Sequence, residues 1–340
     1  MRILTLGALA LLAGCNEPAE PPRELRSGTT VSGHFGPEGT ISEDVSGLAC
    51  DWQRGGDSMR CLAIEDEGDS AQWTSFNGTV LAAGQRFGLR EGGAPLGSAP
   101  RDICDEYDPE SREVDGEAAA YSDGVFYVTG SHGCARNSND FRPASFIVAR
   151  IAPDEPRGPI VPGTVALTTS HRLARLMQQD ETLAPYFGAS LYDANGLNIE
   201  GLAVDGDRMI FGLRAPSIEG HAYLFETSAT ALFSRQIVGS GRSLTVPLGR
   251  DTGIRDLAFL PDGRLLILSG PAQDQDVAYR IHLRTNDGAV STLETLSPAG
   301  NSKPEALAIV GLQGRVLSLL ILFDSAADGA PEPLTLRLPR

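Results

Sequence analysis

Five polar residues stand at the first position of a short phrase that recurs along the chain. The phrase runs polar residue, small residue, Leu or Ala, Ala, apolar residue, at intervals of about 50 to 80 residues. Its first positions are Ser46, Glu117, Glu200, Arg255 and Glu305. Carboxylates and a guanidinium at equivalent places of a repeat can pair with one another, hold a cation or bind a charged ligand. These positions are therefore the first candidates for function.

The sequence around each phrase predicts the element that carries it. Asp123-Gly124, Asp205-Gly206 and Asp262-Gly263 follow three of the copies, and Asp-Gly between apolar runs is a strong hairpin signal. Further strand-like runs complete each unit, and the 39 glycines agree with a turn-rich chain. Short antiparallel strands in a radial repeat indicate an all-β fold, a β-propeller. A β-sandwich, or two small β domains, is the alternative.

Five phrases predict five blades, with one helical insertion. Six blades are the alternative, because the interval between the second and third phrase is long. A helical apolar spacing over residues 171–187 accounts for that extra length without another blade. The last unit offers three strands, and we expect residues 29–34 to supply its missing outer strand and close the ring.

Topology predicts that the polar residues gather at one end of the propeller. Consecutive strands of a blade are antiparallel, so the start of the first strand and the end of the second lie at the same end. Residues just past the second strands join the first positions there. They are Asp66, His132, Arg214, Lys303 and Asp324. The long connections 90–116 and 170–198 leave on this face, and we expect them to wall a site.

Three interpretations of this cluster follow from its chemistry. In the structural one, Glu and Arg pair around the channel and lock the blades together. In the second, Glu117, Glu200 and Glu305 bind a hard cation such as calcium.

In the third interpretation, the cluster is a substrate pocket. Arg214, Arg255 and Lys303 bind an anionic group, and Glu117, Glu200 or His132 acts as a catalytic base. The predicted ligand-binding set is completed by two carboxylates. They are Glu305 and Asp324. We expect Glu200→Gln to abolish ligand or metal binding with little loss of fold.

The N-terminus predicts export and a lipid anchor. A basic start and a short apolar run lead to Leu12-Ala13-Gly14-Cys15, which resembles the bacterial lipobox. We expect a signal peptide over 1–14, a lipidated Cys15, a flexible tether over 15–28 and one propeller domain over 29–340. Asn16 follows the cysteine, with no Asp there to indicate inner-membrane retention. The predicted location is the bacterial cell envelope, at the outer membrane facing the periplasm.

Four cysteines remain after Cys15, and an exported chain with an even number predicts disulfides. Four cysteines allow three pairings. We favour Cys50–Cys61, which flank one hairpin, and Cys104–Cys134, which lie in loops on the same face. Cysteine and histidine spacings typical of zinc sites are absent from the sequence.

The net charge of −16 becomes one unit more negative when residues 1–14 are removed. Such an acidic chain repels nucleic acid and anionic lipid head groups, so we expect neither as a partner. We expect a monomer.

Several motifs resemble a known family. They are Asp115-Gly116-Glu117, Asn198-Ile199-Glu200-Gly201-Leu202-Ala203, Gly253-Ile254-Arg255-Asp256-Leu257-Ala258 and Lys303-Pro304-Glu305. The chain from about residue 46 to about residue 324 resembles the bacterial domain of unknown function 3616, which implies an exported β-propeller with no assigned activity. A weaker similarity to the esterase-like phytase family implies phosphate or ester hydrolysis, but Ser46 and Arg255 replace Glu in two copies.

These observations lead to one prediction and two alternatives for function. The prediction is an exported lipoprotein that binds an anionic small molecule or peptide at the face of Glu117, Glu200, Arg255 and Glu305. The first alternative is a calcium-assisted hydrolase of phosphate esters or lactones. The second is a periplasmic protein-interaction scaffold without a small ligand.

Overall fold

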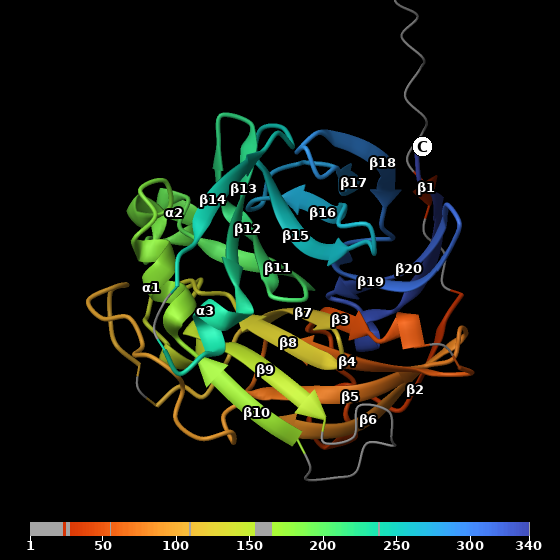
Figure 1. Cartoon of the computed structure of the whole chain (residues 1–340), viewed down its shortest axis with the longest axis horizontal. Helices are drawn as coiled ribbons and strands as arrows, with labels where there is room; N and C mark the ends of the chain where they lie inside the picture. Colours follow the sequence, from red (N-terminus) through yellow and green to blue (C-terminus); the bar gives the residue numbers. More distant parts are fainter. Residues whose placement is uncertain are drawn as a thin grey trace, which may run out of the picture.

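The chain forms a five-bladed β-propeller in the computed structural model, as predicted (Figure 1). The structure describes residues 23–24, 28–54, 56–108, 110–153, 165–236 and 239–339. Cys15 and the predicted signal peptide lie outside these residues. No helix among them is long and apolar enough to cross a membrane.

Each blade is one antiparallel sheet whose first strand lies nearest the common axis (Figure 1). Blade I contains β3 Val45–Cys50, β4 Met59–Glu65, β5 Ser70–Phe76 and β6 Val80–Gly88. Blade II contains β7 Gly116–Ser122, β8 Val125–Gly130, β9 Val148–Pro153 and β10 Val165–Ser170. Blade III contains β11 Asn198–Asp205, β12 Arg208–Ile218, β13 His221–Ser228 and β14 Arg242–Val246. Blade IV contains β15 Thr252–Phe259, β16 Leu265–Pro271, β17 Arg280–Arg284 and β18 Val290–Ser297. Blade V contains β19 Lys303–Gln313, β20 Val316–Asp324 and β21 Glu332–Arg337.

The core lies between the blades, because each sheet is covered on both faces. Phe146 of blade II packs in one cluster with Phe211 and Phe225 of blade III. Leu266 and Leu268 of blade IV pack with Ile321 of blade V in the same way. Strands buried on both faces need apolar residues at successive positions, which explains runs such as Leu319–Phe323.

A β-bulge interrupts the inner strand of every blade at the first position of the repeated phrase. The register passes from Ile199 to Gly201 in β11 and from Ile254 to Asp256 in β15, so that Glu200 and Arg255 have no partner on the second strand. In the other three blades, the register shift likewise leaves the first position of the phrase, Ser46, Glu117 or Glu305, without a partner on the second strand. A bulge bends its strand and redirects the side chain of the extra residue. It is therefore the local structure that distinguishes these five residues.

The ring closes differently from the sequence prediction. The strand β2 Thr30–Ser32 pairs in parallel with β6 at the outer edge of blade I, and not with blade V. In the described part of the chain, blade V keeps three strands. The expected outer strand of blade V was wrong because residues 28–34 run along β6, whose edge is open to them.

Short helices and turns occupy the connections. The predicted helix is present as α1 Arg172–Gln178, and α2 Leu191–Ala194 and α3 Ala229–Phe233 are shorter. Single 3-10 turns are η1 Pro37–Gly39, η2 Trp52–Arg54, η3 Pro143–Phe146, η4 Ala184–Tyr186 and η5 Ala327–Gly329. Two residues of the predicted tether form β1 Arg23–Glu24, which pairs in parallel with β18.

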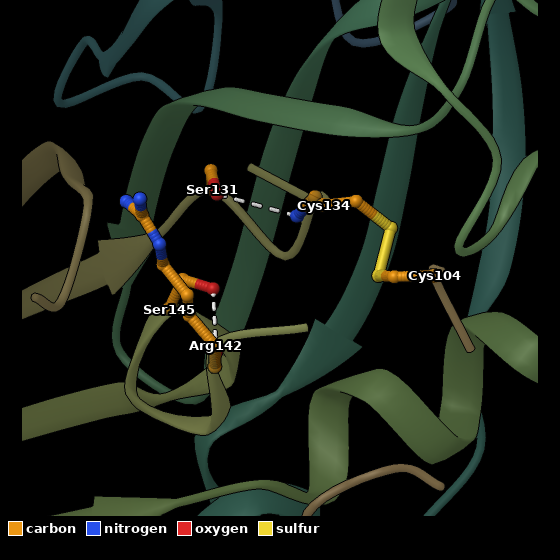
Figure 2. Close-up of a disulfide and its surroundings, with 6 residues drawn as sticks. Cys104, Ser131, Cys134, Arg142 and Ser145 are labelled. Atoms are coloured by element: carbon orange, nitrogen blue, oxygen red, sulfur yellow. Dashed lines mark hydrogen bonds between the residues drawn. A yellow bond between two sulfur atoms is a disulfide. The ribbon is translucent and has the colours of Figure 1, made fainter. Parts of the chain in front are cut away.

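Both predicted disulfides are confirmed. Cys50 and Cys61 face each other across β3 and β4. Cys104 of the first long insertion is joined to Cys134 in the loop after β8 (Figure 2).

Candidate functional site

Four of the predicted site residues form a chain of buried ion pairs. The Nη1 atom of Arg214 lies 2.7 Å from Oε1 of Glu200, and Nε of Arg255 lies 2.8 Å from Oε2 of the same carboxylate. Arg255 also contacts Glu305. Arg255 is 1% exposed, and its partners lie on the neighbouring blades III and V. These residues therefore connect three blades, as the structural interpretation predicted.

Blades I and II are joined at the same level by a neutral group. The hydroxyl of Ser46 donates a hydrogen bond to the carbonyl oxygen of Gly116. The first position of blade I thus serves the contact with blade II, which explains why it is not charged.

Asp256 is a buried polar residue that sequence reasoning did not single out. Its carboxylate accepts hydrogen bonds from the backbone N–H groups of Leu257 and Leu307, each at 2.7 Å. Burial raises the pKa of Asp256 well above its ordinary value, and these backbone donors oppose the rise. The signal was present in the sequence, because a charged residue stands here at a position that is Gly or Ala in the other four phrases.

Glu117 differs from Glu200 and Glu305 in its surroundings. It is 6% exposed, and no hydrogen bond or ion pair of its side chain is found within the described ranges. Burial raises the pKa of Glu117 well above its ordinary value, and the nearby Asp115, Glu200 and Asp66 raise it further. The charge of Arg214 opposes this rise. The shift favours the protonated form of Glu117 relative to an exposed glutamate.

Glu117 lines a cavity of about 310 Å³ at the predicted polar end of the channel. Asp115, Glu113 and Asp66 contribute further carboxyl groups, while Arg136 and Arg142 are its basic residues. Arg142 pairs with Glu113 at 2.5 Å. The cavity is therefore acidic.

The walls of this cavity come from the predicted insertions. Residues 113–115 end the first insertion, Leu191 belongs to α2 in the second, and residues 134–138 follow the disulfide. Figure 2 shows how Cys104 holds Cys134 beside Ser131, with Arg142 and Ser145 on the adjacent loop.

Three buried polar atoms of the cavity lining have no hydrogen-bond partner among the described residues, and they are two acceptors and the donor Nε of Arg142. Asn198 is 7% exposed, and its Oδ1 atom has no hydrogen-bond partner among the described residues. The same is true of Oδ1 of Asp66. Burial and the neighbouring Asp115 raise the pKa of Asp66 to about 8.

Asp66 was predicted at this face, whereas Asp115 and Asn198 were not proposed as site residues. The sequence nevertheless contains a signal for Asp115 and Asn198. Each stands two residues before a first position, where four of the five copies carry a polar residue.

The opposite half of the channel is apolar. The ends of the inner strands, with Trp52 and Phe259, line a space of about 60 Å³ there. The chemistry of the channel is consequently concentrated at the end that carries Glu117.

The remaining predicted residues lie in other surroundings. His132 is buried, its Nδ1 atom lies 3.0 Å from the carbonyl oxygen of Gly130, and its ring meets Phe146 edge-on. Burial lowers the pKa of His132 to about 4, so the ring is neutral. Lys303 pairs with Asp324 at 3.0 Å. His132, Lys303 and Asp324 are not among the residues that line the cavity of Glu117.

Among the described residues, no group of three or more His, Cys, Asp or Glu side chains is placed to hold a metal ion. The predicted metal ligands Glu200 and Glu305 are paired with arginines, whereas Glu117 is not. A calcium site therefore stays a prediction, for which the donor arrangement gives little support.

The fold gives the class of this protein, and comparison with known proteins gives its family. The fold defines a five-bladed β-propeller with an acidic cavity at one end of its channel. The chain belongs to the family described as "Protein of unknown function (DUF3616)", which matches residues 163–332. This confirms the resemblance seen in the sequence motifs. No curated protein matches the chain.

Several solved structures are similar to the chain at low identity. An exo-β-1,3-galactanase from Clostridium thermocellum has 13% identity and a TM-score of 0.45, over 91% of this chain and 62% of that one. The catalytic domain of an α-L-arabinofuranosidase from Coprinopsis cinerea has 11% identity and a TM-score of 0.43, over 93% and 98%. Regucalcin from Agrobacterium tumefaciens, a calcium-binding protein, has 11% identity and a TM-score of 0.38, over 93% and 98%. The chain spans less than two thirds of the galactanase, and likeness at this level says nothing about the chemistry of the cavity.

Proposed function

We propose that this protein binds a small ligand through a cationic nitrogen, an ammonium or guanidinium group, in the cavity of Glu117. The observation that carries the proposal is the set of unpaired acceptors in that cavity, with Glu117 buried and without a partner in the described residues. Oδ1 of Asn198 and Oδ1 of Asp66 complete the set. A ligand rich in N–H donors satisfies these atoms and replaces the protons held by the carboxyl groups.

The balance of charge favours a cation over the anion predicted from sequence. Arg214 and Arg255, expected to bind an anionic group, are each paired with a carboxylate. Arg136 is exposed on the cavity wall and forms no ion pair within the described ranges. It is the group that an anionic ligand would use.

The test is calorimetric titration of the wild type and of Glu117→Gln with 1,4-diaminobutane, arginine, calcium chloride and inorganic phosphate. We expect an amine or arginine to bind the wild type and to bind Glu117→Gln at least about tenfold more weakly, because the variant keeps the shape of the side chain and removes its charge. Glu181→Gln, an exposed carboxylate away from the cavity, is the matched control and should bind like the wild type.

The pH dependence adds a second readout with a definite sign. A bound cation favours the ionised carboxylates, so binding releases protons from Glu117 and Asp66. Affinity should therefore rise from about pH 6 to about pH 9, across the pKa of about 8 of Asp66, while an amine probe stays protonated. Glu117→Gln should reduce this rise to the part that Asp66 contributes.

The other outcomes decide between the alternatives. Binding of phosphate that is lost in Arg136→Gln would support the anionic ligand instead. Turnover of a phosphate ester or lactone that needs calcium would support the hydrolase. No binding of any probe to the wild type would contradict the proposal.

We further propose that the protein is exported and anchored by lipid at Cys15, at the outer membrane facing the periplasm. The support is the sequence Leu12-Ala13-Gly14-Cys15 after a basic start and a short apolar run. Metabolic labelling with a radioactive fatty acid should mark the wild type and leave Cys15→Ser unlabelled. Equal labelling of both would contradict the anchor.

A further inference from the structure

A second cavity lies beside the first, on the other side of the Cys104–Cys134 disulfide. It has a volume of about 650 Å³ and is walled by residues 98–107 with Phe141 and Pro143. Cys104 lines this cavity, and Cys134 lines the cavity of Glu117. The disulfide therefore joins the linings of the two cavities, and Figure 2 shows its position in the loops.

Tyr107 presents an aromatic face in this second cavity. Its ring is stacked on that of Phe141, with centroids 5.6 Å apart and planes inclined by 23°. Phe141 is buried, whereas Tyr107 is 64% exposed. Since one face of the Tyr107 ring rests on Phe141, its exposure belongs to the opposite face and the edge.

The segment that carries Tyr107 is held in place, although it is an insertion. The backbone N–H of Phe141 donates to the carbonyl of Glu106 at 2.6 Å, and that of Asp108 donates to the carbonyl of Phe141 at 3.0 Å. Asp105 bonds to Asn139 in the same way at 2.9 Å. Together with the disulfide, these bonds fix the ring before any ligand arrives, which lowers the entropic cost of binding.

Carboxylates line the same cavity as the Tyr107 ring. Asp102, Asp105 and Glu106 line the cavity, and no ion pair of their side chains is found among the residues that the structure describes. Arg101 is the basic residue of the lining, so the charge of the cavity is negative. An exposed aromatic face in a cavity with carboxylates suits a planar cation, which can stack on the ring and donate N–H groups to carboxylate oxygens.

We infer that this cavity binds a guanidinium group, that of an arginine side chain in a partner peptide, with its plane on Tyr107 and its N–H groups toward Asp105 and Glu106. Pro143 and Ile103 offer apolar contacts to the aliphatic stem of such a side chain. A neutral sugar also stacks on aromatic rings, but it would leave the repulsion among the carboxylates unrelieved. The site is independent of the proposed ligand of Glu117.

The inference is tested by an NMR titration of the isotope-labelled protein with N-acetylarginine amide. Its neutral isostere N-acetylcitrulline amide is the control. We expect the arginine probe to shift the amide signals of Tyr107 and Phe141, and the citrulline probe to bind at least about tenfold more weakly.

Variants identify the groups responsible. Tyr107→Ala should weaken the arginine probe by about fivefold or more, while Tyr107→Phe keeps the ring face and should stay within about twofold of the wild type. Glu117→Gln should leave these shifts unchanged, which separates this site from the cavity of Glu117. The side chain of Tyr107 is largely exposed, so its variants should fold.

Three results would overturn the inference. They are equal binding of the arginine and citrulline probes, unchanged shifts in Tyr107→Ala, or stronger perturbation of Tyr107 by methyl galactoside than by the arginine probe.

Discussion

Arg255 shows how a residue chosen as a ligand contact can instead hold the fold. Its side chain is fully enclosed and meets Glu200 at 2.8 Å as well as Glu305. Burial lowers the pKa of Arg255, and the charge of Glu200 opposes that shift. A buried pair of this kind gives little net stability over apolar packing, but removing one member leaves the other charge buried and alone.

Replacement of Arg255 by methionine should therefore destabilise the protein by about 3–5 kcal/mol at neutral pH, because the buried Glu305 loses its arginine partner and Glu200 keeps only Arg214. Urea denaturation followed by circular dichroism measures the change. Arg112→Met is the matched control, since Arg112 pairs with Asp69 while its side chain is 72% exposed, and it should cost at most about 1 kcal/mol. Equal stability of the two variants would contradict the role assigned to Arg255.

Glu200 belongs to the same chain of buried ion pairs, and it too is needed for the stability of the fold. Glu200→Gln was expected to remove binding and spare the fold. Since Glu200 lies between Arg214 and Arg255, its substitution leaves the buried Arg214 without a carboxylate and leaves Arg255 with Glu305 alone. We now expect a loss of stability, and Glu117 is the cleaner position for a test of binding.

At the scale of the strand, the sequence predicted where each element lies and which end of it is polar. The apolar half of the phrase and the Asp-Gly turns indicated five inner hairpins, and all five are present. The pairing of Cys104 with Cys134 followed from the same topology. Local patterns were sufficient here because turns, hairpins and short apolar runs depend on neighbouring residues.

The division of roles among the polar residues was not predictable from the phrase. All five first positions occupy bulges, yet Glu200 is paired twice and Glu117 is not paired at all within the described residues. What decides this is the identity of the residue on the adjacent blade, which is distant in the sequence. For Glu200 that residue is Arg255. Glu117 forms no ion pair among the described residues, although the charge of Arg214 acts on it.

At the scale of the whole molecule, the ring must be closed between blade V and blade I. Asp328 in η5 of blade V accepts hydrogen bonds from the backbone N–H groups of Phe35 at 2.9 Å and Ser42 at 3.2 Å, which precede the inner strand of blade I. In return, the N–H of Asp328 donates to the carbonyl of Ser42 at 2.6 Å. The buried carboxylate of Asp328 thus links blade V to blade I, a role that we had expected an added outer strand to have.

Loss of this carboxylate should destabilise the closed ring. Asp328 has a φ of 51°, a region that glycine and asparagine tolerate, so Asp328→Gly removes the acceptor without adding backbone strain. We expect it to lower the free energy of unfolding by about 2–4 kcal/mol, because two buried N–H groups lose their acceptor. Asp328→Asn keeps an acceptor oxygen and gives up the ion pair with the half-exposed His34, which should cost at most about 1 kcal/mol.

Chemical denaturation gives both values, and hydrogen exchange locates the effect. If Asp328 closes the ring, the amides of β3 and β20 should lose protection in Asp328→Gly before those of β11 and β12 in blade III, which lies away from the junction. A uniform loss of protection across all blades would instead mean that the ring opens only when the whole propeller unfolds, and that Asp328 contributes to global stability without governing closure.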